Sequence, residues 1–181
     1  MNIKDGVNMG KISNKTKMAA NIIEDIIQTS FNAIANFKMY DNELKSLYYK
    51  CENMDNSDLF IELSSIKMFQ KRCYTYAADF INKNMNEAIK DKGLNEHKNT
   101  FKRKLFTQKR LEDIFNLNGY AENIIEDISN SVKQLNEECE DALYEKKVKI
   151  LSYRKGNVDS ITNLASALIK ITDYFEIFTE V

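Results

Sequence analysis

The sequence predicts an all-α fold, an elongated and mostly antiparallel bundle of about five helices, three of them long. Apolar residues recur at steps of three and four along most of the chain, which is the spacing of one face of an α-helix. Proline, which breaks helices and shapes turns, is absent from all 181 residues. No stretch shows the strict alternation of apolar and polar residues that is typical of a half-buried strand.

The first and longest pattern covers residues 14–54. Asp41-Asn42 interrupts it, but Leu44 and Leu47 keep the same phase, so one continuous helix is expected. Because such an apolar stripe is stable in water only when another element covers it, the rest of the chain must supply partner helices. The apolar positions of this helix are Met18, Ile22, Ile23, Ile26, Ile27, Phe31, Ile34, Phe37, Leu44, Leu47, Tyr48 and Cys51.

A second helix is expected after a turn at residues 55–57, with Ser57 as its N-cap. So short a connection forces the first two helices into an antiparallel hairpin. The helix is expected to end near Lys92, with Gly93 as the C-cap. Its inward face is expected to carry Leu59, Leu63, Ile66, Phe69, Cys73, Tyr76, Ala77, Phe80, Ala88 and Ile89.

Glycines mark the remaining helix ends that we expect, since glycine is the preferred residue after a helix C-terminus. A third helix is expected over residues 100–116, before Asn118-Gly119, and a fourth from residue 120 to about residue 155, before Gly156. A fifth helix follows from Asp159 or Ser160. Residues 1–13 lack periodicity and are expected to form a flexible tail, which leaves residues 14–181 as a single helical-bundle domain.

Composition argues against several classes of protein. The formal net charge of −1 gives no overall field toward nucleic acid or a membrane. No signal peptide or membrane-spanning apolar run is visible, which favours a cytoplasmic location. Cys51, Cys73 and Cys139 are far apart, so neither a disulfide framework nor a zinc site is expected. Abundant Asn, Ile and Lys are typical of an AT-rich genome such as that of a phage, a virus or a low-GC bacterium.

No pattern indicates an enzyme, and we expect no cofactor and no metal. A P-loop, a GxSxG elbow and a glycine-rich phosphate loop are all missing from the sequence. His97 is the one histidine, and its polar surroundings favour solvent exposure over catalysis. Glu24-Asp25 and Glu126-Asp127 are adjacent carboxylates, but no Glu-x-x-His motif accompanies them, so solvated carboxylates are favoured over a di-iron site.

The strongest local charge feature is a basic segment without acids, interleaved with Phe101 and Phe106. Such a segment can bind phosphates of nucleic acid or of an anionic membrane, or an acidic protein partner. The favoured interpretation is internal, because residues 100–116 would lie antiparallel to the acidic start of the next helix and pair with it. The cations of the segment are Lys98, Lys102, Arg103, Lys104, Lys109 and Arg110.

Two tyrosines, Tyr49 and Tyr74, fall off the apolar stripes of their helices. An exposed tyrosine on a rigid helix is a good interface anchor, although most such rings lie over a neighbouring helix. The hexapeptide Asn-Ile-Ile-Glu-Asp-Ile occurs at residues 21–26 and again at 123–128. Duplication of a helical hairpin would explain this repeat, but frequent use of the same residues in amphipathic helices is the favoured explanation.

The sequence therefore favours a non-enzymatic helical-bundle protein with coiled-coil-like packing. We expect it to bind another protein, or its own copy as a homo-oligomer, through an exposed helix face. An accessory protein of a phage, virus or pathogen would suit the composition. The alternative is binding of nucleic acid or an anionic membrane through residues 98–110.

Overall fold

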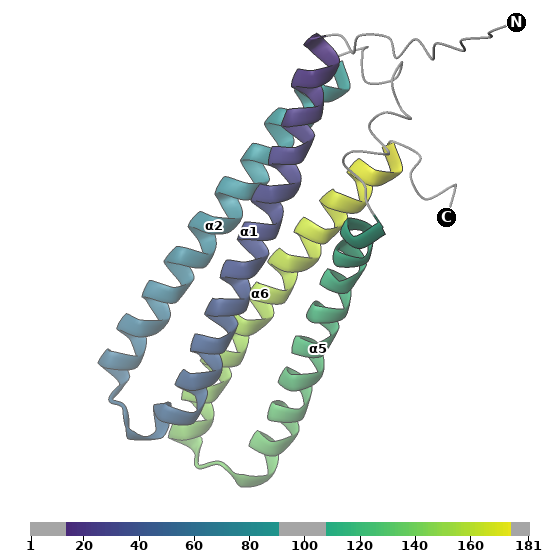
Figure 1. Cartoon of the computed structure of the whole chain (residues 1–181). Helices are drawn as coiled ribbons and strands as arrows, with labels where there is room; N and C mark the ends of the chain where they lie inside the picture. The colour runs from purple at the N-terminus through teal and green to yellow at the C-terminus, as the bar shows by residue number, and fades with distance from the viewer. Residues whose placement is uncertain (1–13, 91–107, 175–181) are drawn as a thin grey trace, which may run out of the picture.

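A computed structural model describes residues 14–90 and 108–174 of the chain (Figure 1). Within these two ranges no strand occurs, so the all-α prediction is confirmed, but four long helices pack together where about five were expected. The elements are α1 (Asn14–Lys50), the 3₁₀ turn η1 (Cys51–Asn53), α2 (Asn56–Lys90), α5 (Gln108–Glu138) and α6 (Asp141–Tyr174).

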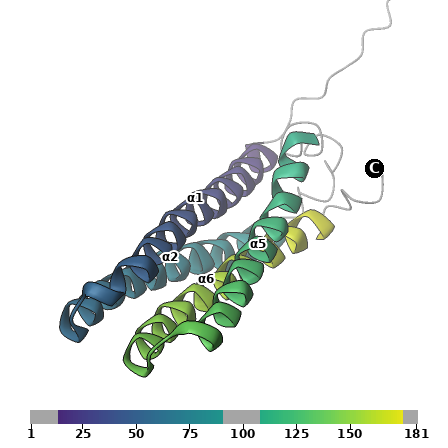
Figure 2. The same cartoon turned by 90° about the horizontal axis from the view of Figure 1, so that it is seen from below.

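The four helices form two antiparallel hairpins whose tight turns lie at the same end of the bundle (Figure 1). As a result α1 and α5 run in one direction, and α2 and α6 in the other. Helix α6 packs against α1, α2 and α5, whereas α2 packs chiefly on α1 and α6. Viewed from below, α5 runs obliquely across α6 (Figure 2). Helix α6 is therefore the element that joins the two hairpins.

Helix α1 is continuous through Asp41-Asn42, as its apolar phase predicts. Its 37 residues span about 55 Å at ~1.5 Å rise per residue. The Asp41 side chain does not cap a new helix, because it is buried and paired with Arg154 of α6. Buried apolar residues follow the helical repeat along the inward face of α1, at Ile23, Ile26, Ile27, Ile34, Phe37, Leu44 and Leu47.

Two details predicted for α2 are wrong. The carboxylate of Asp55, rather than Ser57, caps the helix, with its Oδ1 accepting the backbone N–H of Asp58 at 2.8 Å. Phe69 and Tyr76 were expected inside but are exposed. Only one side of α2 packs against the other helices, namely α1 and α6, so its buried stripe is narrow. The buried residues of α2 are Leu59, Leu63, Ile66, Gln70, Ala77 and Ile81.

The helix ends predicted at Gly119 and Gly156 are also wrong, whereas Gly93 lies outside the described residues. Helix α5 continues through Asn118-Gly119, and α6 continues through Gly156. A glycine inside a helix costs only about 1 kcal/mol relative to alanine, which packing of the flanking apolar residues outweighs. The real turn lies at Cys139-Glu140, where the spacing of Leu135, Cys139 and Leu143 keeps an unbroken helical phase. Periodicity therefore could not reveal this turn.

Replacing Gly156 by alanine is expected to stabilise the protein. Gly156 is exposed within α6, and a Cβ added there would meet no atom within 4 Å. The alanine restricts the unfolded backbone without strain in the folded state, so the free energy of unfolding should rise by about 0.5–1 kcal/mol. Urea unfolding measures this gain, and Ala35→Gly on the exposed side of α1 is the matched reverse control. A loss of stability in Gly156→Ala would contradict it.

Candidate functional site

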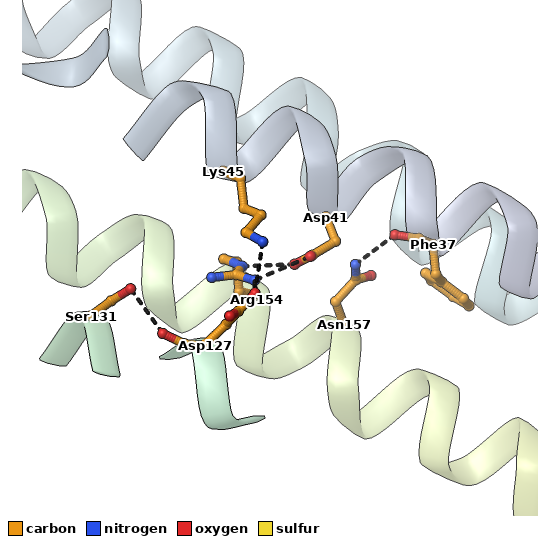
Figure 3. Close-up of polar contacts among 7 residues, drawn as sticks. All are labelled: Phe37, Asp41, Lys45, Asp127, Ser131, Arg154 and Asn157. Carbon is orange, nitrogen blue, oxygen red and sulfur yellow. Dashed lines mark hydrogen bonds and ion pairs between the residues drawn. The ribbon is translucent and has the colours of Figure 1, made fainter. Parts of the chain in front are cut away.

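A buried ion pair joins the two hairpins in the middle of the bundle (Figure 3). The guanidinium of Arg154 on α6 donates from Nε to Oδ1 of Asp41 on α1 at 2.7 Å, and from a terminal nitrogen to Oδ2 at 3.1 Å. Both side chains are at least 95% removed from solvent. Two parallel hydrogen bonds between planar groups fix the distance and the rotation of α6 relative to α1.

The ion pair extends to the surface through α5. Lys45 Nζ on α1 donates to Oδ2 of Asp127 at 2.6 Å, and the same oxygen lies 3.6 Å from a terminal nitrogen of Arg154. The hydrogen bond from Lys45, together with the charges of Lys45 and Arg154, lowers the pKa of Asp127, although partial burial opposes the shift. Ser131 donates to the backbone carbonyl of Asp127, one turn earlier in α5. Three helices thus share one charge network.

Two further polar groups belong to this layer. The buried amide of Asn157 donates from Nδ2 to the backbone carbonyl of Phe37 at 2.9 Å, one helical turn from the Arg154–Asp41 pair (Figure 3). Tyr120 of α5 lies nearby, and burial, with a smaller contribution from the charge of Asp41, raises its pKa to about 12. The phenol therefore stays protonated at neutral pH and acts as a neutral neighbour of the ion pair.

The chemistry of this layer is structural. Arg154 neutralises Asp41, the Tyr120 hydroxyl holds its proton, and no nucleophile with a lowered pKa lies among them. The two grooves of the bundle described here are lined by other residues. A buried pair of this kind fixes which helices associate and in which register.

The larger groove lies between α2 and α6, next to the turns of the two hairpins. Its volume is about 530 Å³, which falls in the range of known binding clefts. Leu59, Leu63 and Val148 supply apolar lining, and Lys67 and Lys149 stand beside them. A smaller groove of about 300 Å³ lies between α1 and α2 and contains acids and a lysine together. The α2/α6 groove is therefore the more apolar and more basic of the two.

The outward side of α2 carries five large hydrophobic side chains. Ile61 and Tyr76 are exposed by 65% and 67%, respectively. Residues seven positions apart share a helix face, so Ile61 and Met68 lie on the same face of α2, and so do Phe69 and Tyr76. We call Phe60, Ile61, Met68, Phe69 and Tyr76 the α2 apolar surface. Large side chains gathered in this way on one helix are typical of a surface that another molecule covers.

The two tyrosines predicted as interface anchors differ in their exposure to solvent. Tyr49 is 77% exposed, and its ring meets that of Tyr48 edge to face. Tyr74 is half-buried and packs against the core. Neither residue belongs to the α2 apolar surface, and their role at an interface stays a prediction.

Most of the predicted basic segment lies outside the described residues, as does His97. Lys98, Lys102, Arg103 and Lys104 belong to this part of the chain. Lys109 and Arg110 begin α5, the same helix that carries Glu122 and Glu126. The predicted antiparallel pairing of residues 109–110 with that acidic segment is therefore wrong, because both lie on one continuous helix.

The cysteine thiols in the described part of the chain are free and do not gather with acids or histidines. Within residues 14–90 and 108–174, no group of three or more His, Cys, Asp or Glu side chains converges as metal ligands would. Cys51, Cys73 and Cys139 are free thiols, and burial raises the pKa of Cys51 and Cys73. None of the helices in these ranges has an apolar stretch sufficient to cross a bilayer.

Sequence reasoning missed the polar layer. Asp41 was noticed only as an interruption of an apolar stripe, and no role was predicted for Arg154 or Asn157, which are buried. One signal was available: Arg154 and Asn157 stand at the helical spacing of the apolar positions Ile150 and Ile161. A polar residue within an apolar stripe implies a buried partner, but the sequence does not identify that partner.

Comparison of the chain with protein-family models, with curated proteins and with solved structures found no match.

We expect strong coupling between Asp41 and Arg154. Arg154→Met should lower the free energy of unfolding by about 3–5 kcal/mol, because it leaves a buried carboxylate without a cation. Asp41→Leu should cost less, since Asp127 remains 3.6 Å from the guanidinium. The double variant should lie within about 1 kcal/mol of the original protein. Urea unfolding of all four proteins measures the coupling, Lys45→Met is a half-exposed control, and additive losses would contradict a buried pair.

Asp127 should make a pH-dependent contribution to stability. Its pKa is lowered in the folded protein, so the contribution is present above the pKa of an unfolded Asp, about 3.9, and is lost as the pH falls through the folded value. Asp127→Asn should be less stable at pH 7 by under about 1 kcal/mol, since the carboxylate is half-exposed. Urea unfolding between neutral and acidic pH should show this gap closing. In a Lys45→Gln background the gap should be smaller throughout, and an unchanged gap would contradict the assignment.

Proposed function

We propose that this chain is a non-enzymatic interaction protein that binds a protein partner through the exposed face of α2. The observation that carries the proposal is the α2 apolar surface, five large hydrophobic side chains on the outer side of one long helix. Burying apolar area releases about 25 cal/mol per Å², so covering such side chains favours association. The partner is another protein or a second copy of the chain.

The arrangement of the α2 apolar surface supports protein binding. Phe60 borders the α2/α6 groove on one flank, and Phe69 on the other flank stacks on Tyr40 of α1 at 6.5 Å between ring centroids. Ile61 and Met68 lie between these flanks and point away from the core. A rigid helix with anchors across its whole outer side presents a preformed surface, which lowers the entropy cost of binding.

Arg72 and Asp79 share the outer side of α2 with these hydrophobic residues. Charged residues at the border of an apolar surface keep the free protein soluble and can determine the orientation of a partner. The described residues give no comparable argument for an active site, since the buried charges Asp41 and Arg154 are paired with each other. Binding of nucleic acid or an anionic membrane through residues 98–110 stays a prediction of the sequence.

Site-specific photo-crosslinking in the cells that make the protein tests this function. A photo-reactive side chain at Ile61 or Met68 should capture a protein of defined mass, because both positions lie within the surface. The same group at Thr162, exposed on α6 and remote from this surface, should capture none. Adding Phe60→Glu should remove the capture while leaving the thermal midpoint within a few degrees, since Phe60 is exposed. Equal capture from Thr162, or none from α2, would contradict the proposal.

A further inference from the structure

The α2/α6 groove has the features of a site for an acidic, apolar helix. Leu59 and Leu63 are buried at its base, and Val148 and Phe60 are exposed at its edges. Among its lining residues three are lysines and one is a glutamate, so its charge is positive although the whole chain is slightly acidic. Helices α2 and α6 are parallel, and a third helix can lie along the groove between them by ordinary ridge-into-groove packing.

Two of the three lysines of the groove are held in position. Lys146 Nζ donates to the backbone carbonyl of Met54 at 2.7 Å and to that of Cys51 at 3.5 Å. Lys67 Nζ lies 5.4 Å from the centre of the Tyr153 ring. Side chains that are already ordered lose less entropy when they meet an anionic partner, so the groove is prepared for one.

The same chain carries a helix face of the opposite character. On α5, Ile125 and Val132 are exposed by 50% and 40% and lie one heptad apart on one side. Glu122 and Glu126 are exposed beside them. Between residues 122 and 138 the exposed charges are four glutamates and Lys133, so this face is acidic. We call Glu122, Ile125, Glu126 and Val132 the α5 acidic face.

The dimensions of the two surfaces agree. Ile125 and Val132 are about 10.5 Å apart along the axis of α5, at ~1.5 Å per residue. The groove residues from Asn56 to Lys67 extend over about 16.5 Å of α2 by the same measure. Both apolar side chains of α5 therefore fit within the length of the groove, and a glutamate on the same helix can reach a lysine at its edge.

We infer that the α2/α6 groove binds the α5 acidic face of a second copy of this chain. This inference goes beyond the proposed function, because the groove shares only Phe60 with the α2 apolar surface and is a second surface of the same helix. Complementary charge and matching length both support a second copy as the occupant. Helices α2 and α5 are the outermost helices of the bundle (Figure 1), so one copy cannot bring its own α5 to its own groove. The contact is head to tail, and its repetition gives rings or open filaments.

Charge reversal on either surface tests this assembly with the full chain. The groove variant carries Lys67→Glu and Lys149→Glu, and the face variant carries Glu122→Lys and Glu126→Lys. Sedimentation analysis of the unchanged protein should show mass that increases with concentration beyond a dimer and decreases with added salt. Each variant by itself should lose association by about tenfold or more, which corresponds to at least ~1.4 kcal/mol.

A mixture of the two variants gives the decisive result. The reversed groove of one protein matches the reversed face of the other, and the unchanged surfaces match as well, so mixing should restore the large species. A control with Lys83→Glu and Lys170→Glu, exposed far from the groove, should associate like the unchanged protein. Circular dichroism checks the fold, and Lys67→Gln with Lys149→Gln is the milder version, for which weaker association is expected.

Three outcomes would overturn the inference: a monomer at every concentration, association indifferent to both reversals, or no recovery on mixing. If the protein is a monomer but a photo-reactive side chain at Ile61 still captures a different protein, this inference is overturned and the proposed function stands. A monomer without any capture would remove both. Binding of phosphatidylserine vesicles that is lost in the groove variant, without self-association, would also overturn it in favour of a lipid surface.

Discussion

A guanidinium and a carboxylate that have both left water must remain together, and in this bundle they come from different hairpins. Arg154 lies on α6 and Asp41 on α1, and each is almost completely buried. The pair costs desolvation energy that its two hydrogen bonds offset only in one geometry. Contacts between leucine and isoleucine side chains would allow α1 and α6 to pack in several registers along their axes, whereas the ion pair forms in only one. The buried ion pair therefore determines the register on which every surface feature depends.

The central place of α6 follows from this register. It packs on α1, α2 and α5, and its buried residues surround the polar layer. Helices α2 and α5 are left on the outside, each with one side toward the core and one toward solvent. An outer helix needs only a narrow buried stripe, so the hydrophobic residues Phe60 and Ile61 of α2 and Ile125 of α5 have no internal role. Their presence outside is the main argument for a partner.

The sequence allowed prediction of helices wherever apolar spacing was long and regular. Helix α1 was predicted through Asp41-Asn42 because Leu44 and Leu47 keep its phase. The ends were harder, since Gly119 lies inside a helix and the turn at Cys139-Glu140 has no glycine or proline.

The exposed apolar surfaces could not be predicted from the sequence for a different reason. The spacing of apolar residues shows which side of a helix is apolar. The number of neighbouring helices decides how much of that side is buried. Phe69 and Tyr76 therefore appeared to belong to the core of α2, although they are exposed. The partner of Arg154 lies 113 residues away along the chain, beyond any local pattern.

The turn end of the bundle shows how local sequence determines the groove. The Asp55 carboxylate caps the start of α2, and Lys146 of α6 donates to the carbonyls of Cys51, the first residue of η1, and Met54, which follows η1. These bonds tie the connection between α1 and α2 to the first turns of α6. The distance between Leu59 on α2 and Val148 on α6 is thereby set by polar contacts outside the apolar core. A groove that is formed in this way is present before any partner arrives, so the energy gained on contact is available for affinity.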